Sequence, residues 1–379
     1  MDMENYMKQV MASLVPVKGS ISEEEIAQLA ANETPLQKKF DNRIGPSVDG
    51  SPQIDYHVFS PVKEDDKTRY PVLIWLHGMS QGKCFREPLR GTDVANFVSP
   101  EYQAKFGDGA YVVVPRANED LGMYATYGFM YTNSWVAGND EIGTSKQLPE
   151  LVAAIKQFFA EEEENIDFSR VYLTGFSAGG YMTWQTLLAM PDVFAAAAPI
   201  CHARFVPTEE QLATVAHVPI WVICGEKDRL YESYVAPTVE KLKTQHPSEL
   251  LRITILEIVY NPDRSHVEDQ HFSWVPVTFD MFYSDGAPYD EKYPEGFIAW
   301  LNEHSKQMSC LKFCTCKHTV CPMHPIHHNG ECAPCIEKNL KHHEIPACFW
   351  NKIGETENAK SEYTFRKFAD KVLACETNI

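Results

Sequence analysis

The sequence predicts an α/β protein with a mainly parallel, helix-covered sheet, followed by a small cysteine-rich domain. Three observations lead to this prediction. Apolar, strand-like runs alternate with helical segments from residue 53 to about residue 306, as in proteins built from crossover connections. A serine in the stretch GFSAGG, residues 175–180, stands between one such strand and one such helix. Seven of the eleven cysteines fall between Cys310 and Cys348.

The expected elements follow in order along the chain. Strands are expected where residues alternate or form short continuous apolar runs, and helices where apolar residues recur at helical spacing. The expected strands are 53–60, 72–76, 110–115, 170–174, 194–200, 220–224 and 251–259, and the expected helices are 148–164, 181–190, 233–245 and 296–306.

We divide the chain into an N-terminal arm (1–50), a main domain with the strand and helix pattern (51–305) and a cysteine-rich domain (306–379). The 34 Lys and Arg against 52 Asp and Glu give a formal charge of -18. Residues 306–379 hold 10 basic and 8 acidic side chains, so +2 lies there and -20 in residues 1–305. The negative electrostatic field of the whole chain repels phosphate groups and anionic headgroups, so we expect neither nucleic acid nor a membrane surface as a partner. The oligomeric state is left open.

The N-terminal sequence MDMENYMKQVMASLVPVKGS lacks a basic segment followed by an apolar one, which argues against a secretory signal. The apolar runs are also far shorter than the roughly 20 residues that span a bilayer. We therefore expect a cytoplasmic protein. Thiols stay reduced in that compartment, so clustered cysteines there indicate metal ligation more than disulfides.

Ser177 is the candidate nucleophile. A tight strand-to-helix turn needs small neighbours so that adjacent backbone can approach, and it lifts the hydroxyl off the sheet edge. The same turn aims the amide of Ala178, at a helix N-terminus, toward a developing oxyanion. A second donor is expected after the strand 72–76, in the stretch LHGMS. There Gly78 permits the sharp turn and the amide of Met79 is the candidate, while His77 is expected to form structural hydrogen bonds.

A serine hydroxyl needs a base, and the base needs an orienting acid. In this architecture both follow the serine along the chain, each after a later strand. Asp228 follows the strand 220–224, with Glu226 as the fallback acid. His266 and His271 both follow the last strand, in the stretch RSHVEDQHFSW. The residues alone leave the choice between these two histidines open.

Residues 70 to about 304 resemble the α/β-hydrolases of the polyhydroxybutyrate depolymerase, feruloyl esterase and predicted-peptidase group. The matching stretches are PVLIWLHG, VVVPRAN, DFSRVYLTGFSAGGYMTW, PDVFAAAAPICH, PIWVICGEKD and HFSW. The resemblance implies Ser177 as nucleophile, Asp228 as acid and His271, in its His-x-Ser-Trp pattern, as base. Many relatives have Gly before this histidine, whereas this chain has Gln270, so His266 remains the alternative base.

The predicted function is a serine hydrolase that cleaves a small-molecule carboxylic ester through an acyl-enzyme, without a cofactor for catalysis. A peptidase or an acyltransferase could use the same residues. A metal-binding interaction protein with a hydrolase scaffold is the alternative of a different class. The aromatic stretch 123–135 is expected either to line an acyl pocket or to pack its loop onto the core.

The cysteine-rich segment has the spacing of a metal site. Two arms of soft ligands about ten residues apart suit a structural tetrahedral zinc ion, although iron–sulfur and metal-free forms stay open. The candidate ligands are Cys314, Cys316, Cys321, Cys332, Cys335 and Cys348. The segment also resembles a small, uncharacterised cysteine-rich domain of anaerobic bacteria, which implies no activity.

Overall fold

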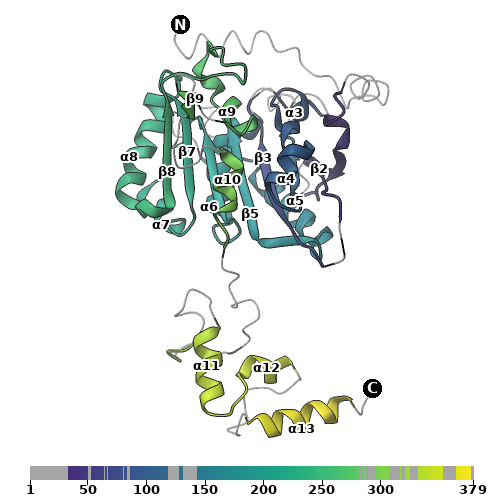
Figure 1. The fold of residues 1–379 in the computed structure, drawn as a ribbon. Helices are drawn as coiled ribbons and strands as arrows, with labels where there is room; N and C mark the ends of the chain where they lie inside the picture. Colours follow the sequence, from purple (N-terminus) through teal and green to yellow (C-terminus); the bar gives the residue numbers. More distant parts are fainter. Residues whose placement is uncertain are drawn as a thin grey trace. The chain divides into compact units, whose positions relative to one another are not determined.

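The chain forms two compact units, Met1–Lys306 and Gln307–Ile379 (Figure 1). The structure, a computed structural model, describes residues 33–49, 53–63, 65, 67–79, 81–82, 86–117, 128–130, 143–281, 283–284, 287–288, 296–306, 316, 321–324, 332–352 and 364–376. Most of the aromatic stretch 123–135 lies outside the described residues.

An eight-stranded sheet with the order β1-β2-β4-β3-β5-β6-β7-β8 organises the first unit. Two neighbouring pairs of strands are antiparallel, β1 with β2 and β2 with β4. All other neighbouring strands pair parallel. The prediction of a mainly parallel sheet is confirmed. The strands are β1 Asp41–Ile44, β2 Asp55–Phe59, β3 Tyr70–Leu76, β4 Tyr111–Pro115, β5 Ile166–Phe176, β6 Ala196–Ile200, β7 Ile220–Gly225 and β8 Leu251–Leu256.

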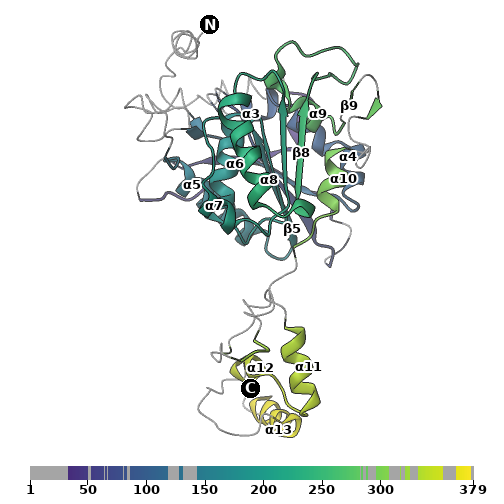
Figure 2. The ribbon, with the colours of Figure 1, turned by 90° about the vertical axis from the view of Figure 1, so that its left-hand side faces the viewer.

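Helices cover both faces of this sheet. Helices α4 and α10 lie on one face, and α5, α6 and α8 lie on the other (Figures 1 and 2). The α-helices are α3 Glu87–Arg90, α4 Pro100–Lys105, α5 Leu148–Glu161, α6 Ala178–Ala189, α7 Glu209–Thr214, α8 Ala236–Gln245, α9 Val275–Thr278 and α10 Phe297–Asn302. Short turns of 3-10 helix are η1 Gln37–Lys39, η2 Val94–Val98, η4 Gly128–Met130, η7 Ser248–Leu250 and η8 Gln270–Phe272, and η6 Tyr231–Val235 is a π-helix. A separate two-stranded antiparallel sheet is formed by β9 Tyr283–Ser284 and β10 Ala287–Pro288.

The burial of the strands explains their continuous apolar sequences. Every residue of β3, β4, β6 and β7 is buried, as expected for parallel strands with helices on both faces. Because parallel strands end at the same edge of a sheet, the loops after β3, β5, β7 and β8 meet there, which is where ligands bind in open α/β sheets.

The second unit contains α11 Ala333–Lys341, α12 Ala347–Lys352 and α13 Phe365–Glu376. Within the described part of the chain, none of the helices combines the length and the apolar character that crossing a membrane requires.

Candidate active site

Ser177 occupies a sharp turn between β5 and α6. Its backbone has φ 56° and ψ -115°, a left-handed conformation that is costly for a residue with a side chain. The turn is held by a hydrogen bond from the Ser177 amide to the carbonyl of Ile200, 3.0 Å. A Cβ atom at Gly179 would lie 1.9 Å from the Leu76 carbonyl oxygen. Only glycine therefore lets α6 start so close to the end of β3.

The structure brings Ser177, His271 and Asp228 into one hydrogen-bonded chain. The Ser177 hydroxyl lies 2.9 Å from His271 Nε2, and His271 Nδ1 lies 2.8 Å from Asp228 Oδ2. An ionised carboxylate only accepts hydrogen bonds, so Nδ1 carries the proton and Nε2 accepts from the serine. His271 is in η8, and Asp269 caps this turn by accepting the His271 amide.

Asp228 is a buried carboxylate held in its charged form. Burial pushes the pKa of Asp228 upward, but the hydrogen bond and charge of His271 and the amide of Leu230 outweigh it, so the pKa lies below its ordinary value. The Leu230 amide donates to Asp228 Oδ1 over 2.9 Å. The acid is therefore ionised at neutral pH and can stabilise an imidazolium at His271.

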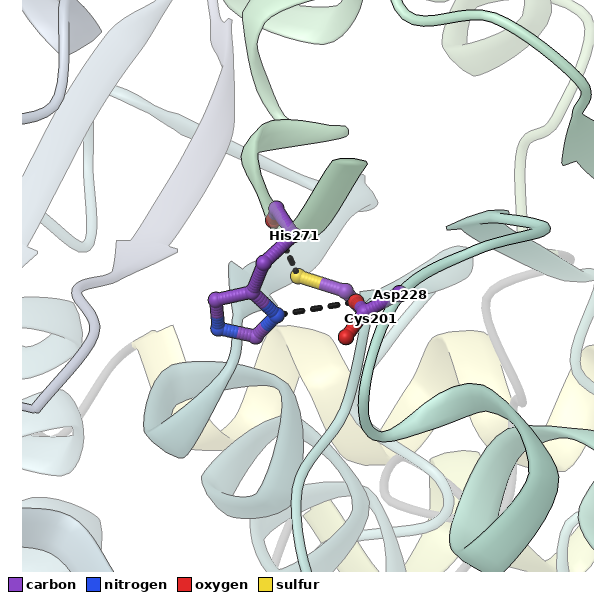
Figure 3. A group of neighbouring side chains, drawn as sticks. All are labelled: Cys201, Asp228 and His271. Carbon is purple, nitrogen blue, oxygen red and sulfur yellow. Dashed lines mark hydrogen bonds and ion pairs between the residues drawn. The ribbon is translucent and has the colours of Figure 1, made fainter. Parts of the chain in front are cut away.

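Two buried thiols adjoin this pair. Cys201 Sγ donates to the carbonyl of His271 over 3.3 Å (Figure 3). Cys224 Sγ donates to Asp228 Oδ2 over 3.5 Å. Burial, followed by the charge of Asp228, raises the pKa of both thiols. They are therefore neutral donors and weak nucleophiles.

Cys201, Asp228 and His271 also form the single group of three potential metal ligands that the described residues bring within 4.8 Å of one another. Their atoms are already engaged: Asp228 Oδ2 accepts from both His271 and Cys224, and the Cys201 thiol points at a carbonyl. The arrangement suits proton transfer better than metal binding.

The loop after β3 carries the predicted oxyanion donor Met79, and His77 braces it. His77 Nδ1 donates to the Gly78 carbonyl over 2.7 Å, and Nε2 accepts the Ala117 amide over 2.9 Å. Burial, with a smaller contribution from the charge of Arg116, lowers the pKa of His77 to about 4. A neutral ring with both nitrogens engaged is a structural link. The oxyanion roles of Met79 and Ala178 stay predictions.

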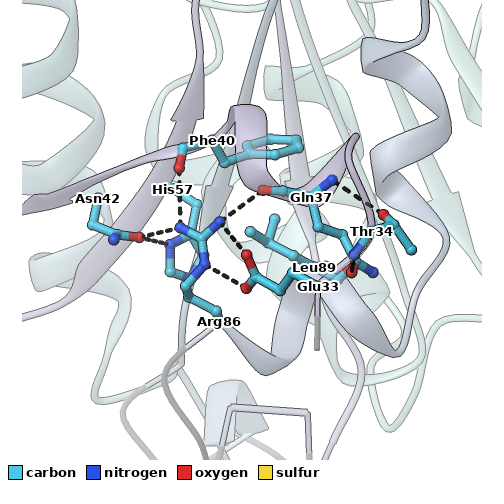
Figure 4. Close-up of polar contacts among 8 residues, drawn as sticks. All are labelled: Glu33, Thr34, Gln37, Phe40, Asn42, His57, Arg86 and Leu89. Atoms are coloured by element: carbon cyan, nitrogen blue, oxygen red, sulfur yellow. Dashed lines mark hydrogen bonds and ion pairs between the residues drawn. The ribbon is translucent and has the colours of Figure 1, made fainter. Parts of the chain in front are cut away.

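Arg86, further along the chain after β3, binds the N-terminal segment (Figure 4). All five N–H donors of its guanidinium group are used, by both carboxylate oxygens of Glu33, the carbonyls of Gln37 and Phe40, and Asn42 Oδ1. Gln81 adds a local brace, because its side chain accepts the Gly78 amide and donates to the Gly91 carbonyl.

Two sequence candidates lie away from this chain of hydrogen bonds. His266 is exposed, bridges to Tyr260 across a small antiparallel turn and packs its ring 5.1 Å from that of Tyr260. Glu226 is also exposed. The geometry therefore favours His271 over His266 and Asp228 over Glu226.

Sequence reasoning gave no sign of the contacts that Cys201 and Cys224 make with His271 and Asp228. It also missed the ring stack of Phe176 on Trp274, with centroids 4.0 Å apart. This stack joins the residue before Ser177 to the helix start after His271. Nothing in the local sequence signals these pairings, because they join separate strands and loops.

Only Gly128–Met130 of the aromatic stretch is described. Phe129 is buried, and its ring lies 4.9 Å from that of His77. This part of the stretch packs on the core.

The predicted metal ligands of the second unit are not gathered by its described residues. Cys314 lies outside them, while Cys316, Cys321, Cys332, Cys335 and Cys348 are described. His324 is buried, with Nε2 3.2 Å from the Cys316 carbonyl. No three of the described ligand atoms in this unit come within 4.8 Å of one another. The zinc site stays a prediction.

Comparison with known proteins follows the same division into two units. Residues 131–250 match the Prolyl oligopeptidase family, and residues 308–377 match a family described as Domain of unknown function (DUF6485). Among solved structures, a thermostable esterase superposes with a TM-score of 0.55 at 24% identity, covering 72% of this chain and 64% of its own.

Curated relatives include both esterases and peptidases. Poly(3-hydroxyalkanoate) depolymerase C of Paucimonas lemoignei is 29% identical over 38% of this chain and 30% of its own length. A bifunctional acetylxylan esterase/xylanase of Neocallimastix patriciarum is 28% identical over 38% of this chain and 17% of its own. Dipeptidyl peptidase 8 of Mus musculus is 22% identical over 60% of this chain and 23% of its own. The chain thus spans less than a third of each of these relatives. With the sheet topology, these matches show an α/β-hydrolase fold in the first unit, which is similar in sequence to a depolymerase, an esterase and a peptidase, and a segment that matches DUF6485 follows it.

Proposed function

We propose that the first unit is a serine hydrolase that cleaves carboxylic esters of small molecules through an acyl-enzyme. The observation that carries the proposal is the hydrogen-bonded chain from Ser177 through His271 to Asp228, with distances of 2.9 and 2.8 Å. A serine hydroxyl next to an oriented imidazole is an activated nucleophile. A complete chain of this kind also argues against a catalytically silent scaffold that serves only to present a metal-binding domain.

In the proposed mechanism, His271 Nε2 takes the hydroxyl proton as Ser177 Oγ attacks the ester carbonyl. Asp228 stabilises the imidazolium through the Nδ1 hydrogen bond. The imidazolium then returns the proton to the leaving alcohol as the carbon–oxygen bond of the ester breaks. Water repeats the attack on the acyl-enzyme with the same base, which releases the acid and restores Ser177.

We assign the oxyanion to the backbone amides of Ala178 and Met79. Ala178 is the first residue of α6, so its amide lacks a partner within the helix and lies at the positive end of the helix dipole. Met79 follows Gly78 in the loop braced by His77. In comparable sites one such donor contributes about 3 kcal/mol to the stability of the transition state.

Ester cleavage is our first choice among reactions that share this machinery. The depolymerase and acetylxylan esterase relatives are 29% and 28% identical, against 22% for dipeptidyl peptidase 8. A peptidase is the closer alternative, because residues 131–250 match the Prolyl oligopeptidase family. Acyl transfer would require a nucleophile that outcompetes water at the acyl-enzyme.

The purified chain should hydrolyse p-nitrophenyl esters, and Ser177→Ala should lower kcat by at least about 10⁴-fold. Ser169→Ala, on the same strand β5 but outside the catalytic chain, is the matched control and should retain activity. Substantial ester hydrolysis by purified Ser177→Ala would contradict the proposal. A panel of acyl esters of increasing chain length, run beside chromogenic peptides, separates an esterase from a peptidase.

A further inference from the structure

Gln270, the residue before His271, joins two strand ends through its side chain. Its Oε1 accepts the Lys227 amide and its Nε2 donates to the Glu257 carbonyl, each over 2.6 Å. Lys227 lies in the loop after β7 that carries Asp228, and Glu257 directly follows β8. Both functional ends of this amide are therefore engaged by backbone groups of two different segments.

The contact extends to the residues on either side. In the loop after β7, Asp228 pairs with His271, and the next residue, Arg229, forms a 3.0 Å ion pair with Asp269. Thus residues 227–229 meet residues 269–271, each through one polar contact. The His271 turn is docked on the Asp228 loop by contacts on both sides of the catalytic pair.

The backbones also pack closely at this point. A Cβ atom at Gly225 would lie 2.5 Å from the Gln270 carbonyl oxygen and 2.7 Å from its Cβ. No side chain fits between the end of β7 and residue 270. The gap between the two loops is therefore fixed by direct contact, and the Gln270 side chain sets how they lie relative to each other.

We propose that Gln270 is a positioning residue that fixes His271 between Asp228 and Ser177. The inference rests on the proposed function and identifies a residue on which catalysis depends beyond Ser177, His271 and Asp228. The turn η8 spans only Gln270–Phe272, and so short a turn has little stability of its own. Errors of about 1 Å in such a geometry can cost about 10²-fold in rate.

The test replaces Gln270 by methionine, which has a similar length but makes neither hydrogen bond. We expect kcat on p-nitrophenyl esters to fall at least about tenfold while KM changes less than about twofold, because a displaced base affects the chemical step more than binding. Gln157→Met is the matched control. Gln157 also makes two side-chain hydrogen bonds, to the Ile44 carbonyl and to Glu161, but on α5.

A double-mutant cycle with Asp228→Asn separates positioning from general damage. If Gln270 acts through the Asp228–His271 pair, Gln270→Met should cost little further kcat in the Asp228→Asn background. An equal loss in both backgrounds, or wild-type kcat in Gln270→Met, would overturn the inference. Thermal unfolding checks that each variant is folded. If Gln270→Met is not, the cycle is run with Gln270→Glu, which keeps the acceptor for the Lys227 amide.

The two proposals fail differently. Ester hydrolysis that survives Ser177→Ala would defeat the proposed function and this inference together. Activity that is lost in Ser177→Ala but unaffected in Gln270→Met would defeat only the role of Gln270.

Discussion

The carboxyl group of Asp280 is buried where α10 begins. Its Oδ1 accepts the Ile298 amide over 2.7 Å, and its Oδ2 forms a 2.8 Å ion pair with Lys105. Burial raises the pKa of Asp280 to about 6, although both partners act in the opposite direction. Between about pH 4 and pH 6 this group is therefore protonated in the folded protein and ionised in the unfolded chain.

Folding takes up a proton in that range, so the contribution of Asp280 to stability falls as the pH rises from 4 to 6. A shift of about two pKa units corresponds to about 3 kcal/mol. We predict that the stability of the wild type relative to Asp280→Asn declines by about that amount between pH 4 and pH 7. Urea unfolding at several pH values measures it, with the surface variant Asp192→Asn as control. A difference that stays constant with pH would contradict the prediction.

Single residues also show where sequence reasoning stops. The order strand, serine, strand, acid, strand, histidine could be followed along the chain, which made Ser177 and Asp228 candidates. The residues alone left the choice between His266 and His271 open, because both follow β8, and only the family resemblance favoured His271. The choice depends on the small turn that pairs His266 with Tyr260 and leaves it exposed.

At the scale of elements, strands buried on both faces were predictable and polar edges were not. The expected strands 72–76, 110–115 and 220–224 appear as β3, β4 and β7 with small changes at their ends. Strand β1, with the sequence DNRI and largely exposed side chains, carries no apolar pattern. It forms because β2 offers a free edge, which is a long-range effect. The antiparallel pairings of the sheet, β1 with β2 and β2 with β4, lie at this same edge.

The N-terminal segment 33–44 is fastened to the first unit by the buried pair of Glu33 and Arg86. Their side chains are 0% and 7% exposed. Removing the charge of one partner leaves the other buried and unpaired, which costs about 3–5 kcal/mol. We predict that Glu33→Gln lowers the free energy of unfolding by about that amount, measured by urea denaturation.

The matched control is Glu240→Gln, which breaks the surface pair with Lys243. Exposed pairs contribute about 0–1 kcal/mol, so this variant should be close to wild type. Equal stability of Glu33→Gln and Glu240→Gln would show that the buried pair does not fasten the segment.

At the scale of the whole molecule, the two units differ in how much apolar surface they bury. The first has a continuous core, whereas Cys348 and Trp350 are the only buried hydrophobic residues described in the second. Six of the nine exposed large hydrophobic side chains in the described part of the chain also belong to the second unit: Met323, Ile336, Leu340, Phe349, Phe365 and Leu373. The described residues of this unit form so small a core that we expect another source of folding energy.

A metal ion held by the cysteines is that source in our prediction, since structural zinc contributes directly to folding. We expect about one zinc per purified full-length chain by elemental analysis. Replacing both Cys332 and Cys335 by serine should abolish it, while Cys375→Ser, outside the paired spacing, should not. Chelation should reduce helical circular dichroism yet leave ester hydrolysis by the first unit intact, because that unit has its own core. If elemental analysis finds neither zinc nor iron in the purified chain, the metal site is refuted. If it finds iron together with sulfide, the cysteines hold an iron–sulfur cluster and not zinc.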